Sequence, residues 1–199
     1  MSAELEINPL LTTPTLRLEP QVAAHAPAVL AALSDPRIYL YIPGTPPTDA
    51  EALRRRFAHQ ESRRSPDGRE LWLNWIVCSG KTVLGTVQAT VHVAQRTADV
   101  AYVFAPEAWG KGHAAEAMRA MLGFLHAGLG VTEFAAHLDT RNTASRRLVE
   151  RLGFVQTDLI LGADHFKGSV SDEYVYKLSA AAFAGSSPTP PLDFPPAGL

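Results

Sequence analysis

The hydrophobic residues of this chain change their spacing near residue 105. Residues 83–91 and 98–104 alternate apolar and polar side chains, and residues 71–78 form a third run that is rich in apolar and aromatic residues. A period of two is typical of a strand with one buried face. Farther along, the spacing becomes that of a helix with one apolar face, at Ala114, Ala117, Met118, Met121, Leu122 and Leu125. The pattern therefore predicts an antiparallel meander of three strands followed by a helix.

Flanking segments complete the predicted order of elements. Thr48 and Glu51 fit a capping box that opens a helix, and Asn142 is suited to cap a helix that Gly153 ends. Further strands are expected at 16–19, 134–138, 154–160 and 172–178, and further helices at 23–33, 48–60 and 142–153. The predicted class is α/β (α+β), with strands and helices in the order strand, two helices, three strands, helix, strand, helix, two strands.

Composition limits the class of protein. Hydrophobic residues make up 46% of the 199 residues and charged residues 19%, which is a globular balance and not a disordered one. The net charge of −2 gives no basic excess for general nucleic-acid binding. A single cysteine, Cys78, excludes an internal disulfide and a CxxC zinc or redox site, and this residue is expected in the core. No metal is therefore predicted.

The two ends of the chain bear on location and domain structure. No apolar run approaches the roughly 18 residues that span a bilayer, and the first ten residues carry two glutamates and no basic region of a signal peptide. A cytoplasmic protein without a membrane partner is expected. Residues 1–179 are predicted to form one domain and residues 180–199 a Pro/Ser/Ala-rich tail. The tail is either loose or a strap docked by Leu192 and Phe194, which leaves a homodimer open.

Residues 102–117, with the sequence YVFAPEAWGKGHAAEA, are the segment most suggestive of chemistry. A strand ends at Phe104, Pro106 breaks it, and Gly110 and Gly112 lead directly into the long helix. Glycines let the backbone approach a ligand closely, and the free N–H groups of a helix N-terminus bind phosphate. The spacing alone fits a phosphate site or an ordinary glycine turn before a helix.

Two other phosphate motifs do not fit. Residues 79–82 read SGKT, like the end of a P-loop, but Trp75 stands where that motif requires glycine, and a strand follows. A hairpin turn is predicted there. The spacing from Gly110 to Ala115 is compatible with a dinucleotide fingerprint, but the parallel βαβ series of that fold is missing around it.

The run YVFAPEAWGKGHAAEAM resembles motif A of the GNAT N-acetyltransferases, and the later run DTRNTASRRLVERLGF resembles motif B of the same superfamily. Together they are similar to the branch that contains the ribosomal-protein N-terminal acetyltransferases, as are residues 13–18 and 171–176. The resemblance covers roughly residues 11–179. It implies a mixed, mostly antiparallel sheet of about six to seven strands flanked by four helices, with strands four and five parallel and splayed.

The resemblance also implies acetyl-CoA as the acetyl donor and a primary amine as the acceptor. The pantetheine arm is then expected to pair with the backbone of Val103 and Phe104. The pyrophosphate is expected on the loop formed by Gly110, Lys111, Gly112, His113 and Ala114. Trp109 stands where the superfamily usually has Gln or Arg, and it either packs over the loop or contacts the cofactor.

Motif B supplies the next candidates. Asn142 is either only a helix cap or also a contact to cofactor or backbone. Ser145 occupies a position where the branch often has serine, and its hydroxyl is a candidate donor to the leaving thiolate; the alternative is a serine on the helix surface. Other superfamily members carry an acidic tyrosine seven residues after the asparagine, but this chain has Val149 there, so that role does not carry over.

A base is expected because aliphatic amines are mostly protonated at pH 7. His137 stands where some superfamily members carry a glutamate, and histidine as a residue type titrates near neutral pH. His137 is therefore the candidate catalytic base, with a purely structural histidine as the alternative. Asp139 shares its strand face by period two and is expected to attract a cationic acceptor.

The function expected from the resemblance is direct transfer of acetyl from acetyl-CoA to a protein N-terminus or a small-molecule amine in a ternary complex. A GNAT-like module that binds acyl-CoA without turnover is the alternative. The acceptor loops are expected at 43–47, 61–70 and 161–171, and they carry no readable code for the acceptor.

Overall fold

The computed structural model describes residues 7–186 of the chain. These residues form one eight-stranded sheet with helices packed against it. The strand order is β1-β2-β3-β4-β5-β6-β8-β7, and every neighbouring pair is antiparallel except β5 and β6. The predicted mixed sheet with one parallel pair is confirmed. The strands are β1 Leu11–Thr12, β2 Arg17–Pro20, β3 Glu70–Ser79, β4 Thr82–His92, β5 Thr97–Phe104, β6 Glu133–Asp139, β7 Val155–Phe166 and β8 Ser169–Ser179. The parallel pair is fifth and sixth here because the two-residue β1 is counted.

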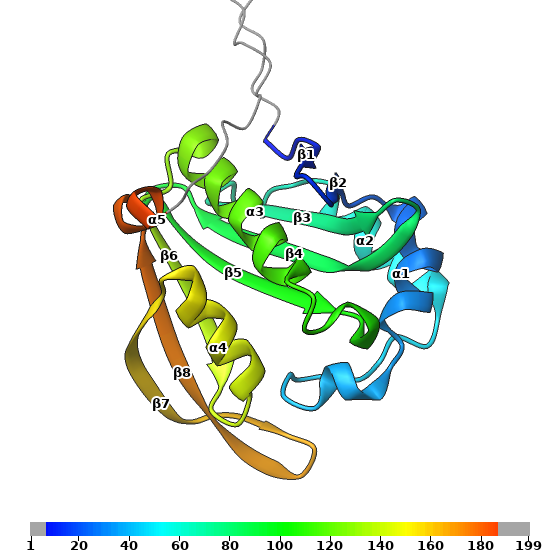
Figure 1. The fold of residues 1–199 in the computed structure, drawn as a ribbon. Helices are drawn as coiled ribbons and strands as arrows, with labels where there is room; N and C mark the ends of the chain where they lie inside the picture. Colours follow the sequence, from blue (N-terminus) through cyan, green and yellow to red (C-terminus); the bar gives the residue numbers. More distant parts are fainter. Residues whose placement is uncertain (1–6, 187–199) are drawn as a thin grey trace, which may run out of the picture.

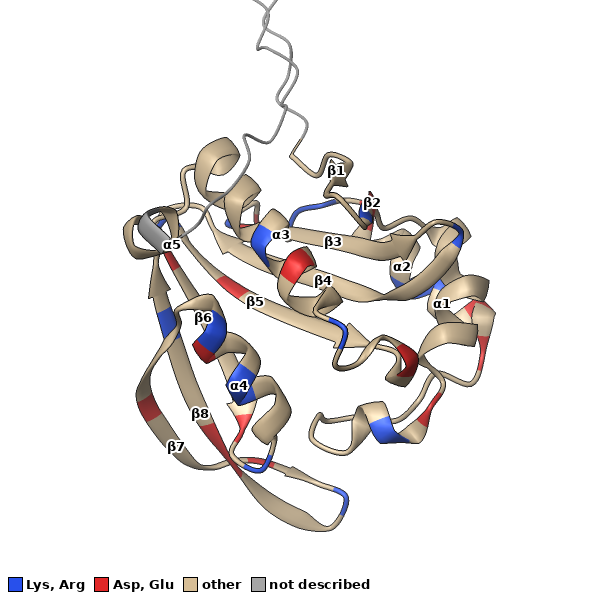
Figure 2. Cartoon of the chain, in the orientation of Figure 1, with Lys and Arg blue, Asp and Glu red and all other residues tan. Residues whose placement is uncertain are grey.

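Helices cover both faces of the sheet (Figure 1). The helices α1 and α2 pack on one face, and α3 and α4 pack on the other. The α-helices are α1 Ala26–Leu33, α2 Ala50–Gln60, α3 His113–Leu129, α4 Thr143–Leu152 and α5 Ala180–Ser186, and the short 3₁₀ turns are η1 Ala23–His25, η2 Pro36–Tyr39 and η3 Pro106–Ala108. Basic and acidic positions are interspersed over these elements (Figure 2). None of the helices within residues 7–186 is both long and apolar enough to cross a membrane.

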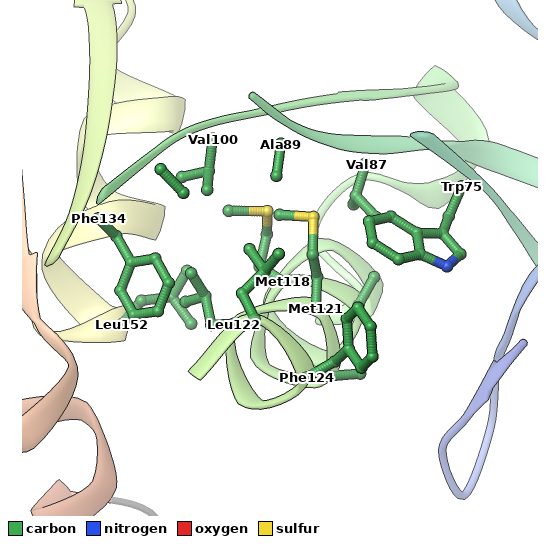
Figure 3. Packing of buried hydrophobic residues seen from close by; sticks show 14 of the residues in the cluster. Trp75, Val87, Ala89, Val100, Met118, Met121, Leu122, Phe124, Phe134 and Leu152 are labelled. Atoms are coloured by element: carbon green, nitrogen blue, oxygen red, sulfur yellow. The ribbon is translucent and has the colours of Figure 1, made fainter. Parts of the chain in front are cut away.

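The main core lies between the sheet and the α3–α4 layer. Met118 and Met121 of α3 point at the strands, with Trp75 and Phe134 on either side (Figure 3). Trp75 also meets Phe124 edge-on, with ring centroids 6.0 Å apart. Ile76 and Cys78 face the other way, into a smaller core under α1 and α2. Strand β3 is therefore buried on both faces, which explains why its sequence is an apolar run and not an alternation.

The start of α2 differs in detail from the expectation. Asp49, and not Thr48, is the N-cap, and its carboxylate accepts hydrogen bonds from Glu51 N at 2.9 Å and Ala52 N at 3.2 Å. A carboxylate at this place also favours the positive end of the helix dipole.

The last hairpin is longer than predicted. Strand β7 runs to Phe166 and β8 starts at Ser169, so the expected loop at 161–171 is mostly paired strand. Lys167 and Gly168 form the two-residue turn, with φ of 52° and 76°. Positive φ at both positions is the geometry that hairpin twist favours. Strand propensity therefore continues past Ile160 through Leu161 to Phe166.

The predicted tail begins as structure. Residues 180–186 form α5, and Phe183 is buried edge-on to Phe134 with centroids 6.3 Å apart. This aromatic contact anchors α5 to the end of the sheet. Residues 187–199, which include the proposed strap anchors Leu192 and Phe194, lie outside the described residues.

Candidate active site

The central feature of the site is a split between β5 and β6. The two strands pair in parallel only at Thr97–Glu133, Ala98–Phe134 and Asp99–Ala135. Beyond Asp99, β5 stays paired with β4 as far as Phe104, and beyond Ala135, β6 stays paired with β8 as far as Asp139. The two strands diverge from this point (Figure 1).

Backbone groups on the inner edge of β5 face the split. Ala105 N donates to Leu84 O of β4 at 2.8 Å. Opposite residues of an antiparallel pair alternate between bonded and non-bonded positions, so Val103 directs its backbone groups toward β4. Tyr102 and Phe104 therefore direct theirs toward the split. Of the two residues expected to bind pantetheine, Phe104 faces the split and Val103 faces β4.

The segment between β5 and α3 forms an open, glycine-lined turn. Gly110 and Gly112 have φ of 69° and 85°, and a Cβ added at either would meet no atom of the described chain within 4 Å, apart from the adjacent residues. Gly112 is the N-cap of the 17-residue α3, and within residues 7–186 no side chain caps this helix end. The first amides of a helix have no partner inside the helix. His113, Ala114 and the exposed Lys111 complete a turn whose geometry suits a phosphate group.

Trp109 braces this turn from the side. Its indole Nε1 donates to Phe104 O at 2.8 Å, and the residue is still 48% exposed. The tryptophan therefore ties the end of β5 to the turn, as the packing alternative proposed, and leaves part of its ring accessible.

Basic positions lie in the loop before α3 and along α4, on the two sides of the split (Figure 2).

The N-terminal turn of α4 forms the opposite wall. Asn142 Oδ1 accepts a hydrogen bond from Ser145 N at 3.1 Å, so this side chain caps α4. Ser145 is half-buried on that turn. Val149 is fully buried one turn later and points into the main core.

Tyr102 connects the two walls and was not singled out from the sequence. Its hydroxyl donates to Ser145 O at 3.2 Å, across 43 residues of chain. Burial raises the pKa of Tyr102 to about 12. The only sequence signal was its place on the face of β5 that also carries Val100 and Phe104.

His137 lies near the apex of the split on the face opposite α3 and α4. Its Nδ1 is 2.7 Å from Glu173 Oε1, and its Nε2 is 4.0 Å from Asp99 Oδ1. Asp99 in turn contacts His92 Nε2 through its other oxygen, at 2.8 Å. The imidazole is 43% exposed. It is therefore oriented by one carboxylate and remains accessible to a ligand at the apex.

Asp139 does not share the role that the sequence suggested. Its buried carboxylate binds Arg141 through Nε at 2.9 Å and Nη2 at 2.6 Å, and accepts from Ser171 Oγ at 2.6 Å. The Arg141 guanidinium is the main reason that the pKa of Asp139 is lowered from 3.8 to about 2. Because its charge is neutralised inside the protein, this side chain locks the end of β6 to the β7–β8 hairpin.

A lysine bridges two segments at the open end of the split. Lys167 Nζ, in the β7–β8 turn, donates to the carbonyls of Tyr39 and Ile42, the latter at 2.9 Å. The ammonium also lies 4.8 Å from the centroid of the Phe166 ring. The hairpin tip and the α1–α2 connection therefore meet on the face that carries His137.

A hollow of about 340 Å³ lies on this same face, between α2 and strands β3 and β4. Its lining is polar and aromatic, and Trp72 and His59 lie in it with ring centroids 5.9 Å apart. The strand register places Trp72 and Thr90 of the lining in one row with Asp99 of β5, at the apex of the split. The hollow and the apex of the split therefore lie along the same row of residues across neighbouring strands.

Comparison with known proteins identifies the superfamily. The profile of the acetyltransferase (GNAT) domain matches residues 15–155, which is more than half of the chain. The chain belongs to the GNAT acetyltransferase family. It is an acetyl-CoA-dependent N-acetyltransferase, so the predicted fold, family and enzyme class are confirmed.

Individual relatives extend over nearly the whole chain. The uncharacterized N-acetyltransferase p20 of Bacillus licheniformis is 26% identical over 176 residues, which is 88% of this chain and 98% of the relative. RimL, a ribosomal L7/L12 alpha-N-protein acetyltransferase solved with coenzyme A, has a TM-score of 0.78 at 16% identity, covering 87% of this chain and 99% of that one. A spermidine N-acetyltransferase SpeG chimera from Vibrio cholerae and hSSAT has a TM-score of 0.71 at 18% identity, covering 85% and 98%.

Proposed function

We propose that the enzyme transfers acetyl directly from acetyl-CoA to a primary amine while both are bound. The observation that carries this proposal is the split between β5 and β6, which has the phosphate-type turn on one side and the carboxylate-held His137 on the other. A donor entering from the α3–α4 side and an acceptor entering from the α1–α2 side would meet inside it. Bringing the two reactants together in one orientation is a large part of such catalysis.

Three segments are proposed to bind acetyl-CoA on the donor side. Amides of residues 110–114 bind the pyrophosphate, assisted by the Lys111 charge. The pantetheine arm lies along the inner edge of β5, where the backbone of Tyr102 and the N–H of Phe104, and not Val103, are turned to receive its amides. The carbonyl of Phe104 already accepts a hydrogen bond from Trp109 Nε1. Asn142 acts through the α4 cap, because its carboxamide oxygen holds Ser145 N in place.

His137 is assigned as the base on the acceptor side. Glu173 holds Nδ1, so Nε2 is the nitrogen free to accept a proton from the attacking amine. The 4.0 Å between His137 Nε2 and Asp99 Oδ1 admits an amine nitrogen within about 2.8–3.0 Å of both atoms. A protonated primary amine has enough N–H groups to donate to both, which supports an amine that arrives as an ammonium ion.

Two classes of acceptor are proposed, a protein N-terminus and a small-molecule amine. RimL is described as acting on a protein N-terminus and the SpeG chimera as acting on spermidine, and both folds resemble this one. The bridged end of the split, from Lys167 to Tyr39 and Ile42, favours an acceptor that presents a narrow end.

The test of the function is thiol release from acetyl-CoA against a panel of amines. The panel contains peptides with different first residues, linear polyamines, and amino sugars. Thiol release that depends on one class of amine and matches its acetylated product supports the proposal. The binding-module alternative requires tight acetyl-CoA binding with no amine-dependent thiol release across the panel.

His137→Gln tests the base. With the best acceptor, kcat/KM of the wild type should rise with pH, and the variant should lose that limb and about 10²-fold in rate. His126→Gln is the control, since His126 is hydrogen-bonded to Val131 O away from the split. A limb that instead follows the pKa of each acceptor and survives His137→Gln would show that the amine deprotonates in bulk water.

A further inference from the structure

The side chain of Tyr102 spans the split between β5 and the α4 wall. It projects from β5 on the α3–α4 face, and its hydroxyl reaches the first turn of α4 at Ser145 O, 3.2 Å away. Its position lies between the glycine turn that follows β5 and the apex at Asp99. A donor molecule that runs from the turn to the apex therefore passes this hydroxyl.

The hydroxyl remains a hydrogen-bond donor at neutral pH. Burial raises the pKa of Tyr102 to about 12, and the hydrogen bond to Ser145 only partly opposes this rise. Its acceptor is a backbone carbonyl at a long donor–acceptor distance for an O–H group. Exchanging this partner for a charged one would give a stronger bond.

Acetyl transfer creates such a partner. As the amine nitrogen bonds to the acetyl carbon, the carbon–sulfur bond breaks and its electron pair goes to the sulfur of CoA. On the proposed assignment, the ammonium ion first loses one proton through His137 to solvent. The second amine proton goes to His137 as the carbon–sulfur bond breaks, which leaves the sulfur as a thiolate. A donor already positioned at the developing charge lowers the barrier, because it needs no reorganisation in the reaction.

We propose that the Tyr102 hydroxyl turns from Ser145 O to the CoA sulfur and donates a hydrogen bond to the departing thiolate. This inference rests on the proposed location of the pantetheine arm. Water protonates the thiolate after it leaves, so the tyrosine keeps its own proton throughout. The hydroxyl acts from β5, whereas the sequence had placed the candidate donor on α4 at Ser145.

The decisive measurement is the thiol pKa of bound CoA, because it needs no acceptor. CoA bound to the protein is titrated with pH, and the thiolate is followed by its ultraviolet absorbance. In the wild type the Tyr102 hydrogen bond should stabilise the bound thiolate. Tyr102→Phe keeps the ring and removes the hydroxyl, so it should raise the thiol pKa by about one unit, a tenfold change in the ionisation constant.

Tyr176→Phe is the matched control. Tyr176 is also buried, its pKa is also raised to about 12, and its hydroxyl also bonds to α4, through Glu150 Oε1 at 3.0 Å. It projects from β8, and the CoA thiol pKa should be unchanged in this variant. An equal thiol pKa in the wild type and Tyr102→Phe would overturn the inference.

A second variant covers the case in which Tyr102→Phe does not fold. Replacing Tyr102 by 3-fluorotyrosine keeps the ring and the hydroxyl and makes the hydroxyl a better donor, so the bound thiol pKa should fall below the wild-type value. An unchanged value would contradict the inference. Failure of CoA to bind the wild type at all would count against the proposed donor site, and this outcome is distinguishable from a bound CoA whose thiol ignores Tyr102.

Discussion

Gly112→Ala tests the donor site. At this position the cost of backbone strain in the protein can be distinguished from a clash with the bound ligand. The φ of Gly112 is 85°, and an alanine there costs roughly 1–2 kcal/mol of backbone strain. Apart from the adjacent residues, no atom of the described chain lies within 4 Å of the added methyl group, which therefore extends into open space beside the N-terminus of α3. A pyrophosphate bound to the first amides of α3 would meet it, so acetyl-CoA affinity should fall at least tenfold, which is about 1.4 kcal/mol.

Gly68→Ala is the matched control for this variant. Gly68 has φ of 70°, also has no atom within 4 Å of an added Cβ, and lies in the α2–β3 connection. Both variants should lose a similar increment of thermal stability, but only Gly112→Ala should lose affinity in calorimetric titrations with acetyl-CoA. Wild-type affinity in a folded Gly112→Ala protein would refute the phosphate assignment of the turn.

Two other predictions concern contacts of the β7–β8 hairpin. Asp139→Asn keeps the side-chain size and removes the charge that Arg141 binds. Because the folded pKa of Asp139 is about 2 against an ordinary 3.8, its carboxylate stabilises the fold above about pH 4 and loses this effect as pH falls toward 2. Urea unfolding should show the variant about 2 kcal/mol less stable at pH 7, with the difference closing near pH 2; an equal difference at both pH values would contradict this. Lys167→Met removes the donor to Tyr39 O and Ile42 O, so the acceptor KM should change by about threefold or more while the acetyl-CoA Kd stays constant; steady-state kinetics with unchanged acceptor KM would exclude a role for the bridge.

Local pattern was enough to predict the frame of the site. The alternation in 83–91 and 98–104 predicted two strands. The observed β4 is one residue longer than predicted at each end, and the observed β5 is one residue longer at its start. The glycine pair before α3 and the Asn142 cap are features of backbone geometry, which a few neighbouring residues determine. These features therefore follow from short stretches of sequence without knowledge of the sheet.

Contacts between distant residues were beyond the sequence pattern. Tyr102 meets Ser145 because the fold brings α4 beside β5. His137 meets Glu173 because β6 pairs with β8. The role expected of Asp139 failed for the same reason. Period two correctly placed it on one face with His137, but its partners include Ser171 on a strand that pairs with β6.

The register of the sheet explains why the split persists and what it is suited to bind. Each strand is fully engaged on its outer side, β5 with β4 as far as Phe104 and β6 with β8 as far as Asp139. Closing the split would sacrifice those pairs, so the inner-edge groups beyond Asp99 and Ala135 are left without a strand partner in residues 7–186. Polar backbone groups in such a position need another partner. An extended ligand that carries its own amides satisfies them as an added strand would, and the pantetheine arm of acetyl-CoA has that chemistry. The same divergence leaves His137 accessible on the other face. On the proposed assignment, the end of β5–β6 pairing therefore makes room for the donor on one face and for the acceptor on the other.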